Sequence, residues 1–230
     1  MTETEWIADR FKTQTVQKYQ QVLKRKRGQL ILKRIFDIIV SSILLVILLP
    51  LLIVLAIWIK IDSPGPVFYR QERVTTNGKL FRIFKFRTMV QNADKLGSLV
   101  TEDNDPRISH VGSILRDCRL DEIPQLINIF LGDMSFVGTR PEVRKYVESY
   151  TDEMVATLLL PAGVTSLASI MYKDEAQEIS HYIEEGYTAD EAYVSFILPK
   201  KMEYNLAYLE ELSLWYDIKL MVKTVVAVIK

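Results

Sequence analysis

Cysteine and histidine are scarce in this 230-residue chain, which contains one cysteine, Cys118, and two histidines. A single cysteine excludes a disulfide framework and any metal site built from several thiolates. The 29 basic and 29 acidic side chains cancel, so the net charge gives no reason to expect a nucleic acid as a partner. The sequence also lacks a P-loop, a dinucleotide-binding fingerprint and a pair of histidines at metal-ligand spacing. Disulfide scaffolds, cysteine-based zinc modules and P-loop nucleotide binders are therefore excluded.

The most prominent feature that is present is a long apolar run. Residues 38–59 are 22 consecutive positions without a charge, and 17 of them are Leu, Ile or Val. As a helix this run would be about 33 Å long, which is enough to cross the hydrocarbon core of a bilayer. Pro50 lies in its middle and removes one backbone hydrogen bond, and Lys and Arg flank the run on both sides, as they do on cytoplasmic loops. Two interpretations stay open: a kinked transmembrane helix, or a re-entrant helix that breaks at Pro50 and returns to the same face.

The segment after the apolar run predicts a β-hairpin. Residues 67–74 and 80–87 are rich in aromatic and branched side chains, and the Asn-Gly pair at 77–78 is a turn signal between them. Alternation along the second strand places Lys85 and Arg87 on one face, toward solvent or a ligand.

Helices are expected on either side of this hairpin. Apolar spacing predicts them at about 110–118, 122–131 and 142–159. Residues 1–30 are polar with a basic end, which indicates a surface helix on anionic headgroups or a solvated extension. Near the C-terminus, Trp215 and flanking lysines accompany an apolar helical face, which favours an interfacial helix over a core helix.

The densest polar stretch contains the adjacent carboxylates Asp121 and Glu122. Pro124 is tolerated only in the first turn of a helix, so a helix should begin near Asp121, where its N-terminus would favour negative charge. Asp121 is then either an ordinary helix cap or a reactive carboxylate. Arg140 follows in a Gly-flanked turn and has the geometry to bind a phosphate through two N–H groups, or it is simply an exposed side chain.

A second possible site is the sequence Asp103-Asn104-Asp105. Two carboxylates at this spacing are how many nucleotide-sugar glycosyltransferases hold a divalent cation on a diphosphate. The same residues followed by Pro106 are also typical of a plain turn.

Several motifs occur in a specific order along the chain: Lys33-Arg34-Ile35-Phe36-Asp37, Ser63-Pro64-Gly65-Pro66, Arg70-Gln71-Glu72-Arg73-Val74, Lys85-Phe86-Arg87-Thr88-Met89, Leu120-Asp121-Glu122-Ile123-Pro124-Gln125-Leu126 and Gly138-Thr139-Arg140-Pro141. Over about residues 31–230 this set resembles the bacterial sugar transferase family, the monotopic phosphoglycosyl transferases that start glycan assembly on a polyprenol phosphate. Thr139 stands where the family's usual Gly-Pro-Arg-Pro motif has proline. Differences of this kind bear on the identity of the sugar more than on the reaction.

The resemblance implies a reaction and a site. Sugar-1-phosphate would move from a UDP-sugar to undecaprenyl phosphate with release of UMP, with Mg²⁺ and a covalent phosphosugar–aspartate intermediate. Asp121 would be the nucleophile and Glu122 the metal ligand. The basic positions expected to contact phosphates are Lys85, Arg87, Arg107, Arg116 and Arg140.

The resemblance also implies an architecture. The expected fold class is α+β: a membrane-embedded monotopic protein with a re-entrant helix broken at Pro50, interfacial amphipathic helices and a small cytoplasmic domain containing the β-hairpin. The expected divisions are an extension over 1–30, the re-entrant helix over 31–60 and a catalytic domain over 61–230.

The same resemblance predicts where the protein works and with what. The expected location is the bacterial inner membrane with the catalytic domain on its cytoplasmic face, and the expected assemblies include a homodimer and downstream glycosyltransferases of exopolysaccharide, capsule, O-antigen or glycoprotein synthesis. Two alternatives stay open: a glycosyltransferase that uses Asp103 and Asp105 and releases UDP, and a membrane scaffold without activity.

Overall fold

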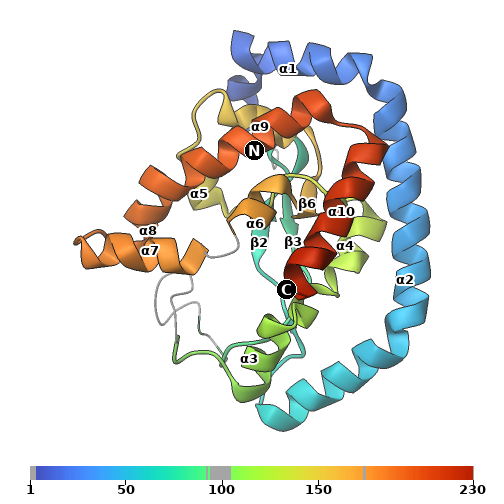
Figure 1. Ribbon diagram of the computed structural model, residues 1–230, viewed down its shortest axis with the longest axis vertical. Coiled ribbons are helices and arrows are strands. Elements are labelled where there is room, and N and C mark those ends of the chain that lie inside the picture. Colours follow the sequence, from blue (N-terminus) through green and yellow to red (C-terminus); the bar gives the residue numbers. More distant parts are fainter. Residues whose placement is uncertain (1–3, 92, 94–104, 173–174, 230) are drawn as a thin grey trace.

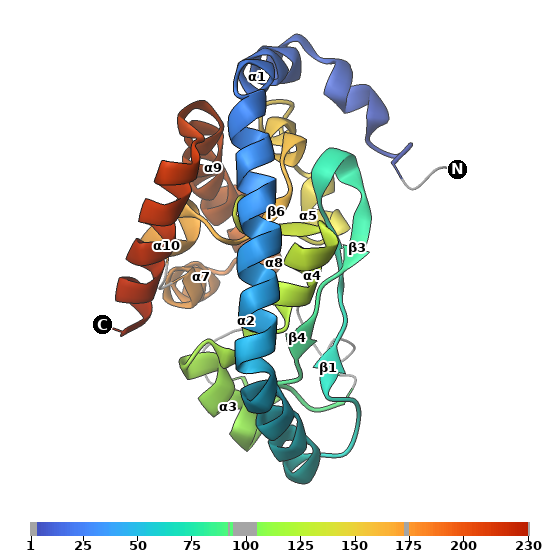
Figure 2. The same ribbon diagram turned by 90° about the vertical axis from the view of Figure 1, so that its right-hand side faces the viewer.

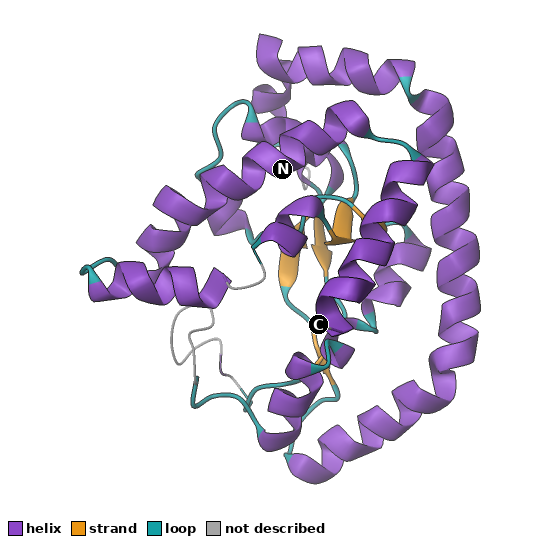
Figure 3. Cartoon of the chain, in the orientation of Figure 1, coloured by secondary structure: helices purple, strands orange, loops and turns teal. Residues whose placement is uncertain are grey.

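A computed structural model describes residues 4–91, 93, 105–172 and 175–229 (Figure 1). The helices are α1 Gln14–Arg25, α2 Arg27–Asp62, α3 His110–Asp117, α4 Gln125–Leu131, α5 Arg144–Glu148, α6 Leu167–Met171, α7 Glu175–Glu184, α8 Ala189–Ala192, α9 Leu198–Glu211 and α10 Leu214–Ile229. The strands are β1 Phe68–Tyr69, β2 Glu72–Val74, β3 Leu80–Arg82, β4 Lys85–Phe86, β5 Met134–Val137 and β6 Ala162–Thr165. Short 3-10 turns are η1 Ala8–Lys12, η2 Thr76–Gly78, η4 Leu120–Glu122 and η5 Met154–Leu159, and η6 Tyr193–Ile197 is a π-helical turn. The strands lie at the centre and helices surround them, so the fold is α+β (Figure 3).

The apolar run forms α2, a helix that continues through Pro50 and bends in its lower part (Figure 1). Both of its halves pack on the same body: Lys33 and Asp37 are buried near its start, and Leu55 and Ile59 near its end. The helix therefore runs along the body over its whole length rather than leaving it at one end. The chain does not reverse direction within α2, so a re-entrant course stays a prediction.

The outer face of α2 is apolar and exposed. Among the described residues it is the one helix whose length and hydropathy would allow a membrane crossing. Its exposed large apolar side chains include Ile31, Ile35, Ile39, Ile43, Val46, Ile47, Ile53, Val54, Ile57 and Ile61. An exposed apolar surface of this extent indicates contact with a membrane.

Helix α10 lies beside α2 (Figure 2) and presents a second apolar face. Its inner side is buried through Asp217 and Leu220, whereas Trp215, Val222 and Val225 are exposed. This division combines the two interpretations of the C-terminal segment, because one face packs in the core and the other is suited to a membrane interface.

The predicted hairpin forms, but in two pieces. β2 pairs with β3 around a turn in which Asn77 is left-handed, and β1 pairs with β4. The ladder is interrupted between them by the side chain of Asn128 from α4, which accepts from the Phe84 N–H at 2.8 Å and donates to the Arg82 carbonyl at 3.1 Å. The interruption fixes the course of the strand that carries Lys85.

A short parallel pair, β5 and β6, positions Arg140. Gly138, directly after β5, lies back to back with Gly163 of β6, and a Cβ on Gly163 would meet the Gly138 nitrogen at 2.2 Å. The Gly163 N–H donates to the Thr139 carbonyl at 2.8 Å, which attaches the segment after β5 to β6. Only glycine permits this approach, and it places Arg140 at the end of β5.

The N-terminal segment packs against the rest of the protein. Ile7, Val16 and Leu23 are buried in the largest apolar cluster. The Trp6 indole donates to the Gly78 carbonyl at 3.2 Å, at the tip of the hairpin. The apolar stripe in this polar segment therefore faces protein, and the described part of residues 1–30 is packed on the catalytic body.

Candidate active site

The two adjacent carboxylates lie in a tight turn between α3 and α4. Arg119 adopts a left-handed conformation with φ of 55°, and η4 begins immediately after it. Pro124 caps α4, so Asp121 and Glu122 precede the helix instead of beginning it. The prediction of a helix that starts near Asp121 is wrong by about one turn, because a proline at this point is also compatible with a cap position.

Glu122 is held by two cations. Its Oε1 accepts from Lys85 Nζ at 2.7 Å and from Arg140 Nη2 at 2.6 Å. Burial opposes the charged form of this carboxylate, but Arg140 and Lys85 outweigh it and hold the pKa of Glu122 well below its ordinary value. Glu122 is thus ionised and fixed in place across the physiological pH range.

Asp121 lies in a different electrostatic setting. It is buried, and its Oδ2 lies 4.0 Å from Lys85 Nζ, beyond hydrogen-bonding distance. Burial raises the pKa of Asp121, whereas the charges of Lys85 and Arg116 lower it. The charge of Glu122 adds to the effect of burial, and the net result is a pKa above the ordinary value of an aspartate. Asp121 thus differs from Glu122, whose pKa is lowered and whose Oε1 is held by two cations.

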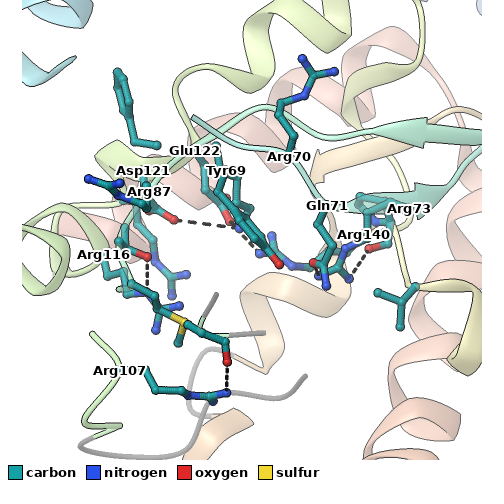
Figure 4. Close-up of a pocket in the computed structure, with 18 of the residues that line it drawn as sticks. Tyr69, Arg70, Gln71, Arg73, Arg87, Arg107, Arg116, Asp121, Glu122 and Arg140 are labelled. Carbon is teal, nitrogen blue, oxygen red and sulfur yellow. Dashed lines mark hydrogen bonds and ion pairs between the residues drawn. The ribbon is translucent and has the colours of Figure 1, made fainter. Parts of the chain in front are cut away.

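Both carboxylates line a cavity of about 1130 Å³. Figure 4 shows them facing it together with arginines from several elements. The basic side chains that line it include Lys85, Arg87, Arg107, Arg116 and Arg140. The structure therefore brings every predicted phosphate-binding residue to the cavity that contains the acidic pair. A concentration of positive charge around two carboxylates favours a polyanionic ligand such as a diphosphate.

Arg87 has a contact that the sequence does not reveal. Its Nη1 donates to the Pro64 carbonyl at 2.8 Å, and its Nη2 donates to the Ser63 carbonyl at 2.7 Å. The turn wraps closely around this guanidinium, because a Cβ on Gly65 would meet Nη1 at 2.0 Å. Arg87 thus attaches the end of α2 to the wall of the cavity, and its contact with a phosphate stays a prediction.

Arg107 and Arg116 are also held by protein groups. Arg107 Nε lies 2.8 Å and 3.0 Å from the two carboxylate oxygens of Asp105, and Arg116 Nε donates to Thr88 Oγ1 at 3.0 Å. Burial lowers the pKa of Arg116, and Asp121 opposes that shift, which confirms that the two side chains are electrostatic neighbours. Both arginines are thus held in fixed positions in the cavity wall, and Arg116 is the one that acts on Asp121.

The alternative cation site at Asp103 and Asp105 is supported by neither residue. Asp103 lies outside the described residues. Asp105 is buried, and its carboxylate is engaged by the Arg107 guanidinium. This guanidinium contacts both oxygens of Asp105 and so competes with a metal ion for the whole carboxylate. At Glu122, by contrast, Lys85 and Arg140 both contact the same oxygen, Oε1.

The donor set at Asp121 and Glu122 was tested for a divalent cation. Within the described ranges, no three His, Cys, Asp or Glu side chains gather as a self-sufficient metal site. Mg²⁺, however, is often bound by one or two carboxylates together with substrate phosphates and water. The adjacent pair fits this mode, in which the phosphates complete the coordination.

The far side of the cavity is lined by polar residues that were not predicted as site residues. These are Gln71, Arg73, Glu142, Glu175, Tyr193 and Lys201. Arg73 and Glu142 do lie in or beside recognised motifs, and that proximity is the one available signal for them. Lys201 belongs to α9, where nothing local distinguishes it from a solvated helix residue. Glu175, at the start of α7, belongs to a stretch of sequence that resembles a variant of the region that shapes the sugar pocket in the family.

Comparison with known proteins identifies the family. The chain matches the family model described as bacterial sugar transferase over residues 28–230. It is 34% identical over 197 residues to a UDP-N-acetylgalactosamine-undecaprenyl-phosphate N-acetylgalactosaminephosphotransferase of Aeromonas hydrophila, covering 84% of this chain and 43% of that protein. It is 36% identical over 199 residues to a UDP-glucose:undecaprenyl-phosphate glucose-1-phosphate transferase of Escherichia coli, covering 85% of this chain and 39% of that protein.

In a third relative, the matched region makes up a larger share of the relative's own length. A UDP-glucose:undecaprenyl-phosphate glucose-1-phosphate transferase of Caulobacter vibrioides is 33% identical over 196 residues, which are 84% of this chain and 68% of that protein. The chain thus spans about two fifths of the length of the first two relatives and about two thirds of the third. The matched region contains the acidic pair, the cations around it and α2. The chain belongs to the bacterial sugar transferase family.

Proposed function

We propose that this protein transfers a sugar-1-phosphate from a UDP-sugar to undecaprenyl phosphate and releases UMP. The observation that carries the proposal is the acidic pair in the basic cavity, where Glu122 is immobilised by Lys85 and Arg140 and Asp121 lies next to it. The names of the relatives support the acceptor and the kind of donor.

The reaction proceeds in two displacements. A carboxylate oxygen of Asp121 attacks the sugar-linked phosphorus, the bond from that phosphorus to the UMP oxygen breaks, and UMP leaves with the electron pair. A phosphate oxygen of undecaprenyl phosphate then attacks the same phosphorus, and Asp121 leaves as a carboxylate. Splitting the transfer in this way allows one phosphate site to serve two bulky substrates in turn.

Charge repulsion is the main obstacle to attack by a carboxylate on a diphosphate. Lys85 and Arg140 form ion pairs with Glu122, and the charge of Arg116 lowers the pKa of Asp121. These cations therefore surround the position where negative charge develops in the proposed reaction. We propose that Glu122 and the diphosphate oxygens hold Mg²⁺, which when bound neutralises phosphate charge as a Lewis acid. The hydrogen bond between Lys85 and Glu122 also keeps the lysine ammonium near Asp121.

The membrane anchor follows from the same proposal. Undecaprenyl phosphate presents its headgroup only at the membrane interface, so the catalytic cavity has to lie there. Because both halves of α2 contact one body, we propose that α2 enters and leaves the cytoplasmic leaflet of the inner membrane from the same side, with the bend near Pro50 deepest. We further expect a homodimer and delivery of the lipid-linked product to downstream glycosyltransferases of a surface glycan.

The test is nucleotide release by purified protein that receives undecaprenyl phosphate, Mg²⁺ and a panel of UDP-sugars. UMP is expected with at least one donor. Replacement of the nucleophile in Asp121→Asn should lower that rate about a thousandfold or more and leave membrane association unchanged. Asp152→Asn is the matched control, because Asp152 is an exposed surface residue with a side-chain exposure of 61%.

Other outcomes would contradict the proposal in distinct ways. Release of UDP would indicate a simple glycosyltransferase and revive the acidic pair at Asp103 and Asp105. Full activity in Asp121→Asn would remove the assigned nucleophile. If folded wild-type protein releases no nucleotide with any donor, a membrane scaffold without activity would be favoured.

A further inference from the structure

A second polar cluster lines the same cavity as Asp121. It consists of Glu142, Glu175, Tyr193 and Lys201, contributed by the loop after β5, by α7, by η6 and by α9. Lys201 Nζ donates to Glu175 Oε2 at 2.7 Å and to the Tyr193 hydroxyl at 3.2 Å. The Tyr193 hydroxyl in turn donates to Glu142 Oε1. The four side chains therefore form one connected network.

Only part of this network is accessible to a ligand. The side chains of Lys201 and Glu142 are 5% and 7% exposed, whereas that of Glu175 is 30% exposed. Glu175 is therefore a carboxylate fixed from behind by a buried cation, with part of its surface open to the cavity. A fixed carboxylate accepts hydrogen bonds with defined direction, because little rotamer freedom is lost when a ligand binds.

The network adjoins the catalytic pair through Arg140. Glu122 raises the pKa of Arg140 most strongly, and the charges of Glu175 and Glu142 raise it further. Arg140 is therefore an electrostatic neighbour of both groups, and it lines the same cavity as Glu122 and Glu175. Because the donor sugar is linked through its anomeric oxygen to the phosphorus that Asp121 attacks in the proposed reaction, the sugar ring has to lie beside Asp121, within reach of a neighbouring cluster.

The chemistry of the cluster suits a neutral polyhydroxylated group. The two carboxylates are paired with Lys201 and Arg73, so the cluster carries little net charge and its cations are already engaged, which gives a phosphate no strong attraction there. The carboxylate oxygens still accept hydrogen bonds well from hydroxyl and amide N–H groups. A sugar that bonds to buried or fixed polar groups is distinguished sharply from an epimer that leaves those groups without a partner.

We propose that Glu175, positioned by Lys201, is a specificity-determining residue that accepts hydrogen bonds from hydroxyl or amide groups of the donor sugar. This inference rests on the proposed function. The Tyr193 hydroxyl bonds to both Lys201 and Glu142. Tyr193 and Glu142 therefore act on Glu175 through Lys201, which makes them positioning residues. The ligand class is a hexose or acetamido-hexose bonded to a diphosphate.

The test compares Glu175→Gln with wild type in the full chain. This change keeps the side-chain volume and replaces one acceptor oxygen with a donor. The ratio of kcat/KM between the best UDP-sugar and its epimers should fall about 10- to 100-fold, the value of one hydrogen bond to a charged group, and mainly through KM. Glu178→Gln is the matched control, because Glu178 is an exposed carboxylate on the same helix. Its ratio should equal that of wild type.

Binding measurements separate this inference from the proposed function. Calorimetry should show that wild type binds the best UDP-sugar more tightly than UDP, that Glu175→Gln loses this difference, and that the affinity for UDP itself is unchanged. This comparison does not depend on turnover, so it stays informative if no UMP is released. Unchanged selectivity in Glu175→Gln, an equal loss of UDP affinity, or no wild-type preference for a UDP-sugar over UDP would each overturn the inference.

Discussion

Lys85 serves both catalytic carboxylates from the strand that precedes them by more than thirty residues. It donates to Glu122 at 2.7 Å and lies 4.0 Å from Asp121. Burial lowers the pKa of Lys85, and the charge of Glu122 opposes that shift. The lysine thus immobilises one carboxylate by contact and acts on the other through space.

Removing this charge should change the pH dependence of the reaction. Burial raises the pKa of Asp121 and Lys85 lowers it, so in Lys85→Met the pKa of Asp121 rises further. Because a protonated carboxyl is no nucleophile, the acidic limb of the kcat/KM profile should move to higher pH. Wild type and Lys85→Met are to be compared in UMP release across the same pH series.

The conservative variant provides the control for this prediction. Lys85→Arg keeps the positive charge, so its acidic limb should stay close to that of wild type even if its rate falls. An acidic limb at the same pH in Lys85→Met as in wild type would show that Lys85 does not influence the ionisation of the nucleophile.

The sequence predicts the acidic pair and the cations around it better than the second polar cluster of Glu142, Glu175, Tyr193 and Lys201. Asp121, Glu122, Lys85 and Arg140 stand in short motifs whose residue types suit phosphate chemistry, and the structure brings them within hydrogen-bonding or ion-pair distance. The contact of Arg87 with the turn after α2 was not predictable, because a backbone carbonyl is a partner that no motif encodes.

Among the elements, the contact of α2 with α10 depends on a buried ion pair. Lys33 Nζ lies 2.6 Å from Asp217 Oδ2 and donates to the Val137 carbonyl at 2.8 Å. The Tyr208 hydroxyl donates to the other oxygen of Asp217 at 2.6 Å. Each group has its partners, so the cost of burying two charges is offset. The pair joins the membrane helix to β5, the strand that leads to Arg140.

Breaking this pair on one side should destabilise the protein strongly. Lys33→Met leaves Asp217 charged and buried, and the expected loss is about 3–5 kcal/mol. The double variant Lys33→Met/Asp217→Leu removes both charges and should lose less than Lys33→Met alone. The measurement is the Tm of the solubilised protein at one fixed scan rate. If the double variant were less stable than Lys33→Met and than Asp217→Leu, the ion pair would stabilise the fold by more than the cancellation of two buried charges.

The hairpin shows why a local sequence pattern does not predict where each strand begins and ends. The alternating residues and the Asn-Gly turn predict two strands, and two strands form. The interruption at Phe84 is imposed by Asn128, which lies 44 positions away and bonds to the backbone there. Since side chains from distant segments compete for backbone groups, the pairing between two strands cannot be derived from the strands alone.

For the whole molecule, the open question with the clearest experiment is the course of α2. Lys24 precedes α2 and Glu72 follows it, and both side chains are exposed. Single cysteines in Lys24→Cys and Glu72→Cys, each in a Cys118→Ser background, are to be labelled with an impermeant maleimide. If α2 is re-entrant, both positions should be protected in intact cells and labelled after permeabilisation.

The second topology gives a different pattern. A transmembrane α2 would expose one of the two positions to the outside, and that position alone would be labelled in intact cells. The apolar composition of residues 38–59 is equally compatible with both patterns, because insertion energy depends on composition and not on where the chain emerges.

The packing of the N-terminal segment separates two kinds of boundary. Similarity to the family begins at residue 28, yet Ile7, Val16 and Leu23 belong to the same apolar cluster as the core of the matched region. The region that matches the family and the unit that packs as one body therefore begin at different residues. A variant truncated to residue 28 would leave a cavity in the apolar cluster and would remove the Trp6 indole that bonds to the tip of the hairpin.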